Sequence, residues 1–164
     1  MKKIIVFIVL STLIFGCIGH KAMKYPEKYL NADAFPSDIK KDGYILLVQK
    51  QETSRMVSNV QNGRVDKLMK RFYDKPYEMV SYTDVTSNSK YANKNVYRYL
   101  LKQSGAQGEQ VITKEPGMGS LHFTYREVFI TDRLLGKDFP GTGQSLDSYE
   151  ADMRVVAPYL GKMK

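Results

Sequence analysis

An apolar run at the start of the chain decides which part of the sequence has to fold into a domain. The run covers residues 4–15, follows two lysines and ends at Gly16-Cys17. A transmembrane anchor is the weaker interpretation, because about 20 apolar residues are needed to cross a bilayer and this run is shorter and contains Ser11 and Thr12. A positive start, an apolar centre and a small residue before a cleavage point are typical of a secretory signal. We therefore expect residues 1–16 to be removed and the fold to lie in the remainder.

The end of this segment resembles a known motif. Ile14-Phe15-Gly16-Cys17 is similar to the lipobox of bacterial lipoproteins, with an aliphatic residue three positions before the cysteine and a small residue directly before it. The resemblance implies cleavage after Gly16 and attachment of a diacylglyceryl group to the Cys17 thiol. Two or three acyl chains would hold the protein on a lipid bilayer, where one chain gives only marginal binding.

The same resemblance implies a location. Ile18 follows the cysteine, where an Asp would resemble the inner-membrane retention signal of some bacteria. We therefore expect a protein of the cell envelope, anchored to the outer membrane and facing the periplasm if the cell has one.

Cysteine content and charge narrow the chemistry further. Cys17 is the only cysteine, so the domain cannot contain an intrachain disulfide. A lone cysteine in an exported chain is either a reactive thiol or a modified one, and its place directly after the apolar run favours modification. The net charge of +8 suits an anionic neighbourhood such as lipid headgroups or cell-wall polymers. We expect no nucleic-acid partner, because an exported, anchored protein seldom meets nucleic acid.

The chain after the cysteine divides into a tether and a domain. Residues 17–41 are polar, contain two prolines and show no sustained apolar period, which predicts a lipidated tether. The turn signal Asp42-Gly43 predicts the start of a single α/β globular domain over residues 42–164.

A βαβ unit is predicted at the start of that domain. Residues 44–48 form a short apolar run typical of a strand buried on both faces. An amphipathic helix should follow, because apolar residues recur at helical spacing among basic ones, at Val65, Leu68, Met69 and Phe72. Asp66 and Lys70 should form an ion pair on this helix. Residues 77–82 predict a second strand, parallel to the first.

The next segment is ambiguous between two structures. Residues 96–101 could continue a helical pattern from Tyr91, but aromatic and β-branched residues favour a strand. That strand would have Tyr97, Tyr99 and Leu101 on one face.

A hairpin and a closing helix complete the predicted fold. Residues 110–114 and 121–130 should pair as antiparallel strands. The alternation of apolar residues in the second arm changes parity after Tyr125, which predicts a bulge at Arg126-Glu127. Apolar residues then step by three and four from Leu146 to Leu160. This pattern predicts a helix capped by Ser145 and kinked or ended by Pro158.

These elements predict the α/β class. We expect a mixed sheet of about five strands with a βαβ start, an antiparallel second half, and helices mainly on one face. In size and layout, the prediction resembles the small bacterial lipoproteins that carry one α/β domain behind a lipidated tether.

Two glycine-containing segments only partly match the motif of dinucleotide-binding loops. Gly117-Met118-Gly119 and Gly141-Thr142-Gly143 begin like dinucleotide-binding loops, but each lacks the third glycine of that motif. Plain loops are the better interpretation, and we expect no cofactor.

His122 is the one histidine inside the predicted domain. Glu127 or Asp132 could orient it, and Asp138 adds a third carboxylate for acid and base chemistry. However, the sequence contains neither a nucleophile elbow nor a zinc-binding helix motif. We predict no catalytic, cofactor-binding or metal-binding residue, and a structural role for an ion pair between Asp132 and Arg133.

Two functions remain. The leading hypothesis is a non-enzymatic, membrane-anchored lipoprotein of the cell envelope. It would act as a binding or assembly module for an envelope protein or a cell-wall partner, through a tyrosine-rich, basic surface on which Lys67 and Arg71 are the charges to test. The alternative is a small envelope hydrolase that uses His122 with a nearby carboxylate. A pocket joining His122, a carboxylate and a hydroxyl would favour the enzyme, and an exposed apolar patch would favour the binder.

Overall fold

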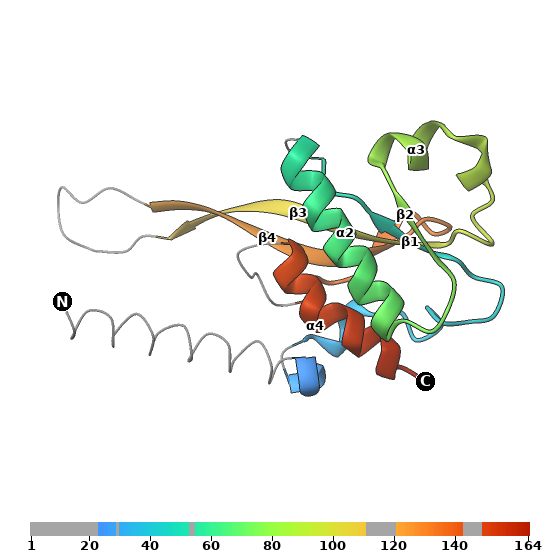
Figure 1. Cartoon of the computed structure of the whole chain (residues 1–164), viewed down its shortest axis with the longest axis horizontal. Coiled ribbons are helices and arrows are strands. Elements are labelled where there is room, and N and C mark those ends of the chain that lie inside the picture. Colours follow the sequence, from blue (N-terminus) through green and yellow to red (C-terminus); the bar gives the residue numbers. More distant parts are fainter. Residues whose placement is uncertain (1–22, 29, 53–54, 111–120, 143–148) are drawn as a thin grey trace.

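The domain is built on one open sheet with helices on both faces (Figure 1). The computed structural model describes residues 23–28, 30–52, 55–110, 121–142 and 149–164, with the backbone alone for residues 55, 104–110 and 121–126. Five strands lie in the order β2-β1-β3-β4-β5. The predicted fold class is confirmed, because the sheet is mixed and the two long helices, α2 and α4, lie on the same face.

The predicted βαβ unit is present. Strand β1 (Leu46–Gln49), helix α2 (Arg55–Phe72) and strand β2 (Tyr77–Val80) follow one another, and β1 pairs with β2 in parallel. The predicted ion pair is also present, with Lys70 Nζ 2.7 Å from Asp66 Oδ2.

Helix α2 begins at Arg55, well before the apolar positions from which it was predicted. The Asn62 side chain ties this first half of the helix to the end of β1. Its Oδ1 accepts from the backbone N–H of Gln51 at 2.9 Å, and its Nδ2 donates to the Gln51 carbonyl at 3.0 Å.

The second half of the sheet contains two long strands. Strand β3 (Tyr99–Gln110) runs parallel to β1 and antiparallel to β4 (Leu121–Asp132), and β4 pairs with the short β5 (Lys137–Asp138). The strand interpretation of residues 96–101 is therefore confirmed from Tyr99 onward. The predicted first arm at residues 110–114 is wrong, because the arm is β3 itself.

The predicted bulge at Arg126-Glu127 is wrong as well. The register of β3 and β4 is unbroken from Tyr99 opposite Asp132 to Gln110 opposite Leu121. The outer half of this two-stranded ribbon extends beyond the rest of the sheet (Figure 1). The parity change in the sequence therefore corresponds to no extra residue in the strand.

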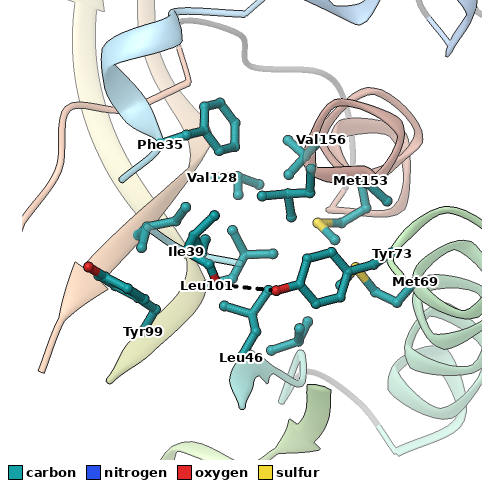
Figure 2. Close-up of a cluster of buried hydrophobic side chains, with 14 of the residues drawn as sticks. Phe35, Ile39, Leu46, Met69, Tyr73, Tyr99, Leu101, Val128, Met153 and Val156 are labelled. Carbon is teal, nitrogen blue, oxygen red and sulfur yellow. Dashed lines mark hydrogen bonds between the residues drawn. The ribbon is translucent and has the colours of Figure 1, made fainter. Parts of the chain in front are cut away.

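Successive residues of the strands point to opposite faces of the sheet and contribute to two hydrophobic clusters, one on each face. The larger one lies between the sheet and the two long helices (Figure 2) and includes Leu46, Val48, Val65, Met69, Tyr99, Leu101, Val128, Ile130, Met153, Val156 and Leu160. The smaller one lies on the opposite face, where α3 (Tyr82–Ser87) and the 3-10 helix η3 (Ser89–Ala92) pack, and joins Leu47, Val80, Tyr91, Tyr97 and Leu100. Tyr97 therefore does not share a face with Tyr99, because it precedes the strand.

The segment before Asp42 belongs largely to the domain. It forms two 3-10 helices, η1 (Pro26–Lys28) and η2 (Ala32–Ala34), and then inserts Phe35 and Ile39 into the larger cluster, where they are 6% and 1% exposed. The Tyr73 hydroxyl donates to the Ile39 carbonyl at 3.4 Å (Figure 2). The predicted tether over residues 17–41 is thus wrong from Pro26 onward, and the domain begins earlier than predicted.

The closing helix α4 (Tyr149–Lys162) continues past Pro158. Proline removes the N–H that would bond to the carbonyl of Arg154, and Arg154 is exposed, so that carbonyl can bond to water. Of the two alternatives predicted for Pro158, ending the helix is wrong, and a kink stays a prediction. The predicted cap, Ser145, lies outside the described residues.

Candidate functional site

The predicted lipidation site lies outside the described residues. This holds for Gly16, Cys17 and the rest of residues 1–22, and for the first glycine motif at residues 117–119. Cleavage after Gly16 and acylation of Cys17 stay predictions.

The two carboxylates weighed as possible partners of His122 make their contacts elsewhere. His122 is near the start of β4, and Asp132 is the last residue of that strand, about 33 Å away at the ordinary rise of a β-strand. Glu127 packs its carboxyl group over Gly141, where an added Cβ would lie 2.0 Å from the carboxyl carbon. The residue that the backbone register does place opposite His122 is Glu109.

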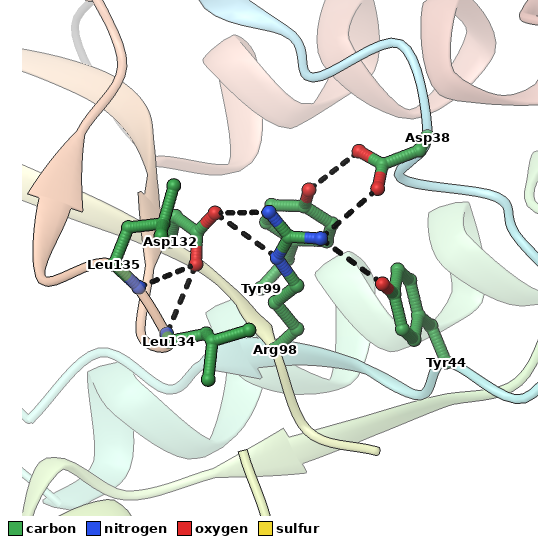
Figure 3. Close-up of polar contacts among 7 residues, drawn as sticks. All are labelled: Asp38, Tyr44, Arg98, Tyr99, Asp132, Leu134 and Leu135. Carbon is green, nitrogen blue, oxygen red and sulfur yellow. Dashed lines mark hydrogen bonds and ion pairs between the residues drawn. The ribbon is translucent and has the colours of Figure 1, made fainter. Parts of the chain in front are cut away.

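Asp132 instead belongs to a polar cluster at one end of the sheet (Figure 3). Its Oδ2 accepts from Arg98 Nε at 3.0 Å and from Arg98 Nη2 at 2.7 Å, and its Oδ1 accepts from the backbone N–H groups of Leu134 and Leu135. Arg98 Nη1 also donates to Asp38 and to the Tyr44 hydroxyl. The cluster thereby joins the N-terminal segment to three strands or their ends.

The electrostatics of this cluster indicate a structural role. Burial opposes ionisation of Asp132, but the donors from Arg98 and the two amides outweigh it and lower the pKa of its carboxyl group. Burial and the hydrogen bond to Asp38 raise the pKa of Tyr99. The carboxyl group of Asp132 is therefore held ionised and the hydroxyl of Tyr99 protonated at neutral pH, whereas acid–base catalysis needs a pKa moved toward neutrality.

The ion pair predicted between Asp132 and Arg133 is not formed. Arg133 donates instead to the carbonyls of Tyr97 at 2.7 Å and Tyr91 at 2.9 Å, which fixes the turn between β4 and β5 on η3. Its role is structural, as predicted for the pair.

The remaining predicted positions are also occupied by structural contacts. Asp138 Oδ1 accepts from Thr131 Oγ1 at 2.5 Å and lies 3.5 Å from Lys102 Nζ. In the second glycine motif, the Thr142 N–H donates to the Val128 carbonyl at 3.1 Å. Gly141-Thr142 therefore runs beside β4 and does not open toward a phosphate.

An open cavity of about 560 Å³ lies where the segment before β1 meets the end of α4. Its charged lining is largely paired: Lys40 Nζ lies 2.7 Å from Asp74, and Lys75 Nζ lies 2.7 Å from Asp42. Charges that form ion pairs with each other attract a charged ligand only weakly. We therefore assign the cavity no ligand.

The solvent-facing side of α2 exposes apolar and basic side chains in a regular order. Residues at alternating spacings of three and four form a stripe that is apolar in the first half of the helix and cationic in the second, namely Val57, Val60, Arg64, Lys67 and Arg71. Val57 and Val60 are 47% and 51% exposed, and the neighbouring Met56 is 81% exposed. We call these five residues the α2 stripe.

The side chain of Glu150 in α4 links Arg64 of the stripe to the rest of the domain. Arg64 Nη1 donates to Glu150 Oε2 at 2.9 Å, and Glu150 Oε1 accepts from Arg154 at 2.7 Å, so α2 is clamped to α4. No ion pair involving Lys67 or Arg71 is found among the described residues, and the Arg71 guanidinium lies 5.0 Å from the Phe72 ring centroid.

The apolar half of the stripe was not predicted. The helix was recognised from Val65 onward, because only there do apolar residues face the core. The spacing of three and four residues from Val57 through Val60 to Arg64 continues the helical period, and it could have indicated that α2 begins before Val65. On this stretch the apolar side chains face solvent and not the core.

Comparisons with family models, curated proteins and solved structures find no match to this chain. Within the described residues, no group of three or more His, Cys, Asp or Glu side chains is arranged to hold a metal ion. Among those same residues, no helix combines the length and the apolar character needed to span a membrane.

Proposed function

We propose that the protein is a lipid-anchored protein of the cell envelope that binds another envelope protein through the α2 stripe. The anchor is the acylated Cys17, on the outer membrane if the cell has one. The observation that carries the binding role is the apolar half of the α2 stripe, since Val57 and Val60 are about half exposed beside the exposed Met56. Adjacent exposed apolar side chains of this kind mark sites of contact with other proteins.

The stripe also defines the chemistry of its partner. A partner segment with apolar side chains facing Val57 and Val60, and carboxylates facing Lys67 and Arg71, would bury the first pair and neutralise the second. The spacing of three and four along the stripe suits an amphipathic helix, whose own side chains recur with the same period.

Site-specific photo-cross-linking in living cells tests this proposal. A photoreactive amino acid is placed at Val60 or Lys67 in the full chain, and at the exposed Thr86 of α3 as a control position. We expect one protein adduct from the two stripe positions and none from Thr86. Equal adducts from all three positions would contradict the proposal, and an adduct with glycan instead of protein would replace the partner by a cell-wall polymer.

Charge-reversal variants provide a second test within the same cross-linking experiment. Lys67→Glu with Arg71→Glu should abolish the adduct at Val60, because it places like charges opposite the partner's carboxylates. Lys50→Glu with Lys94→Glu changes the net charge equally at exposed sites outside the stripe and should leave the adduct intact. An adduct that survives the first pair of substitutions would exclude the stripe as the contact.

A further inference from the structure

The first described residues are fixed to one end of the domain. Helix η1 packs against α4, and Lys162 Nζ donates to the Lys24 carbonyl at 2.7 Å. The same ammonium group lies 3.4 Å from the carboxylate of Glu27, the acidic residue of η1. The chain therefore reaches the domain at the end where α4 terminates.

Several basic side chains gather at this end of the molecule, where Lys70 and Lys162 also form ion pairs with Asp66 and Glu27. The C-terminal ends of α2 and α4 meet here, and the last turns contain Lys70 and Arg71 in α2 and Lys162 in α4. Cations are favourable at helix C-terminal ends, which carry partial negative charge.

Two further lysines at this end, Lys24 and Lys28, place their ammonium groups near the ring of Tyr25. The ammonium groups of Lys24 and Lys28 lie 5.4 and 5.0 Å from the ring centroid of Tyr25, which is 41% exposed. Tyrosine with flanking lysine is the combination that suits the boundary between water and lipid headgroups.

The distance from the anchor limits how the domain can lie. From Cys17 to Met23 the chain spans at most about 22 Å in any conformation, because a fully extended residue advances at most about 3.6 Å. The tether expected from the sequence, ending at Lys41, would have reached about 86 Å. An acylated Cys17 therefore keeps Met23, and with it this end of the domain, within about 22 Å of the membrane surface.

We propose that Lys24, Tyr25 and Lys28, together with Lys162, lie against anionic lipid headgroups and orient the domain on the bilayer. The inference rests on the proposed anchoring through Cys17. It places the first half of α2, at the opposite end of that helix, on the side away from the membrane (Figure 1). The apolar half of the α2 stripe is then presented to a partner.

The chain contains no tryptophan, so a single introduced one reports on a single position. Tyr25→Trp probes the proposed membrane face, and Tyr82→Trp probes α3, where Tyr82 is 58% exposed. The processed protein, purified from membranes, is reconstituted into vesicles of equal parts phosphatidylcholine and phosphatidylglycerol with brominated acyl chains, and into vesicles of phosphatidylcholine alone. Bromine quenches tryptophan emission only at close approach.

We expect strong quenching at position 25 in the anionic vesicles and little at position 82. Each lysine near an anionic surface shifts a binding equilibrium about fivefold. Lys24→Gln with Lys28→Gln should therefore lower the ratio of membrane-facing to other orientations about 25-fold, and quenching should fall to its level in phosphatidylcholine. Lys50→Gln with Lys94→Gln, which removes the same charge elsewhere, should leave quenching unchanged.

Three outcomes would overturn the inference. If the protein sediments with both kinds of vesicle but position 25 is quenched no more than position 82, the orientation is wrong while the anchor stands. If the protein sediments with neither, the anchor fails and the orientation with it. If soluble polyphosphate changes the emission at position 25 as much as the anionic vesicles do, the surface recognises phosphate polyanions and not a bilayer.

Discussion

The backbone of Gly161 in α4 lies against the carbonyl oxygen of Phe72 in α2, so closely that a Cβ atom on residue 161 would be 2.0 Å from that oxygen. This contact brings the two long helices together at their C-terminal ends. It also explains a glycine in the last turn of a helix, where glycine costs conformational entropy.

Gly161→Ala should therefore destabilise the domain. Relieving the contact requires the helices to move apart, and overpacking of this kind costs about 1–3 kcal/mol. Gly63→Ala is the matched control in the interior of α2, where an added Cβ meets nothing within 4 Å, and it should stabilise by about 0.5–1 kcal/mol. Urea unfolding of both variants gives the comparison, and equal effects in the two would refute the close approach.

The N-terminal segment should contribute to stability. Ile39 is 1% exposed within the main core, so Ile39→Ala should lower the free energy of unfolding by about 2–5 kcal/mol. Lys41→Ala, two residues away on the surface, should change it by less than about 0.5 kcal/mol. An Ile39→Ala protein that unfolds at the wild-type urea concentration would restore the tether predicted from the sequence.

The Asp132 carboxylate should make stability depend on pH. Its pKa is lower in the folded protein than the ordinary value of 3.8, so its contribution is present above that value and is lost as the pH falls through the folded pKa. Asp132→Asn should cost on the order of 3 kcal/mol at pH 7, because it leaves Arg98 without its buried partner.

Thermal unfolding across acidic pH measures this effect. The difference in stability between the wild type and Asp132→Asn should shrink as the pH falls below 3.8. A difference that stays constant from neutral to strongly acidic pH would show that the carboxylate does not carry the interaction.

The local patterns of the sequence were sufficient for the first half of the sheet. The apolar run that overlaps β1 and the helical period in α2 each reflect burial against the core, so strand, helix and strand could be predicted in order. The outer part of β3 could not, because Ser104 to Gly108 carry no apolar alternation and the strand is held by its pairing with β4. Phe35 and Ile39 were missed because short 3-10 turns give buried residues no regular spacing.

Only some residues of the candidate site could be predicted from the sequence. Lys67 and Arg71 could be chosen from the sequence, since they occupy the polar side of a recognisable helix. Val57 and Val60 could not, because apolar residues on a helix are ordinarily assigned to the core. The partners of Asp132 also escaped prediction: Arg98 and Asp132 meet across β3 and β4, and only the strand register brings them together.

His122 separates the binding module from the alternative hydrolase. His122→Gln should leave the cellular function intact in a complementation assay, because the Glu127 carboxyl group packs over Gly141 and Asp132 lies at the far end of β4 from His122. Glu109→Gln, at the position opposite His122 in the register, serves as the companion variant. Loss of function in both variants, with hydrolytic activity in the purified wild-type protein, would establish the enzyme.

The account of location and orientation depends on the chemistry of Cys17, and mass spectrometry of the protein isolated from membranes measures it directly. We predict that the mature chain begins at Cys17 and that its N-terminal peptide carries the mass of a diacylglyceryl group, which Cys17→Ala removes together with processing. A mature chain that begins elsewhere, or that retains a free thiol at Cys17, would contradict the lipid anchor and the membrane orientation built on it.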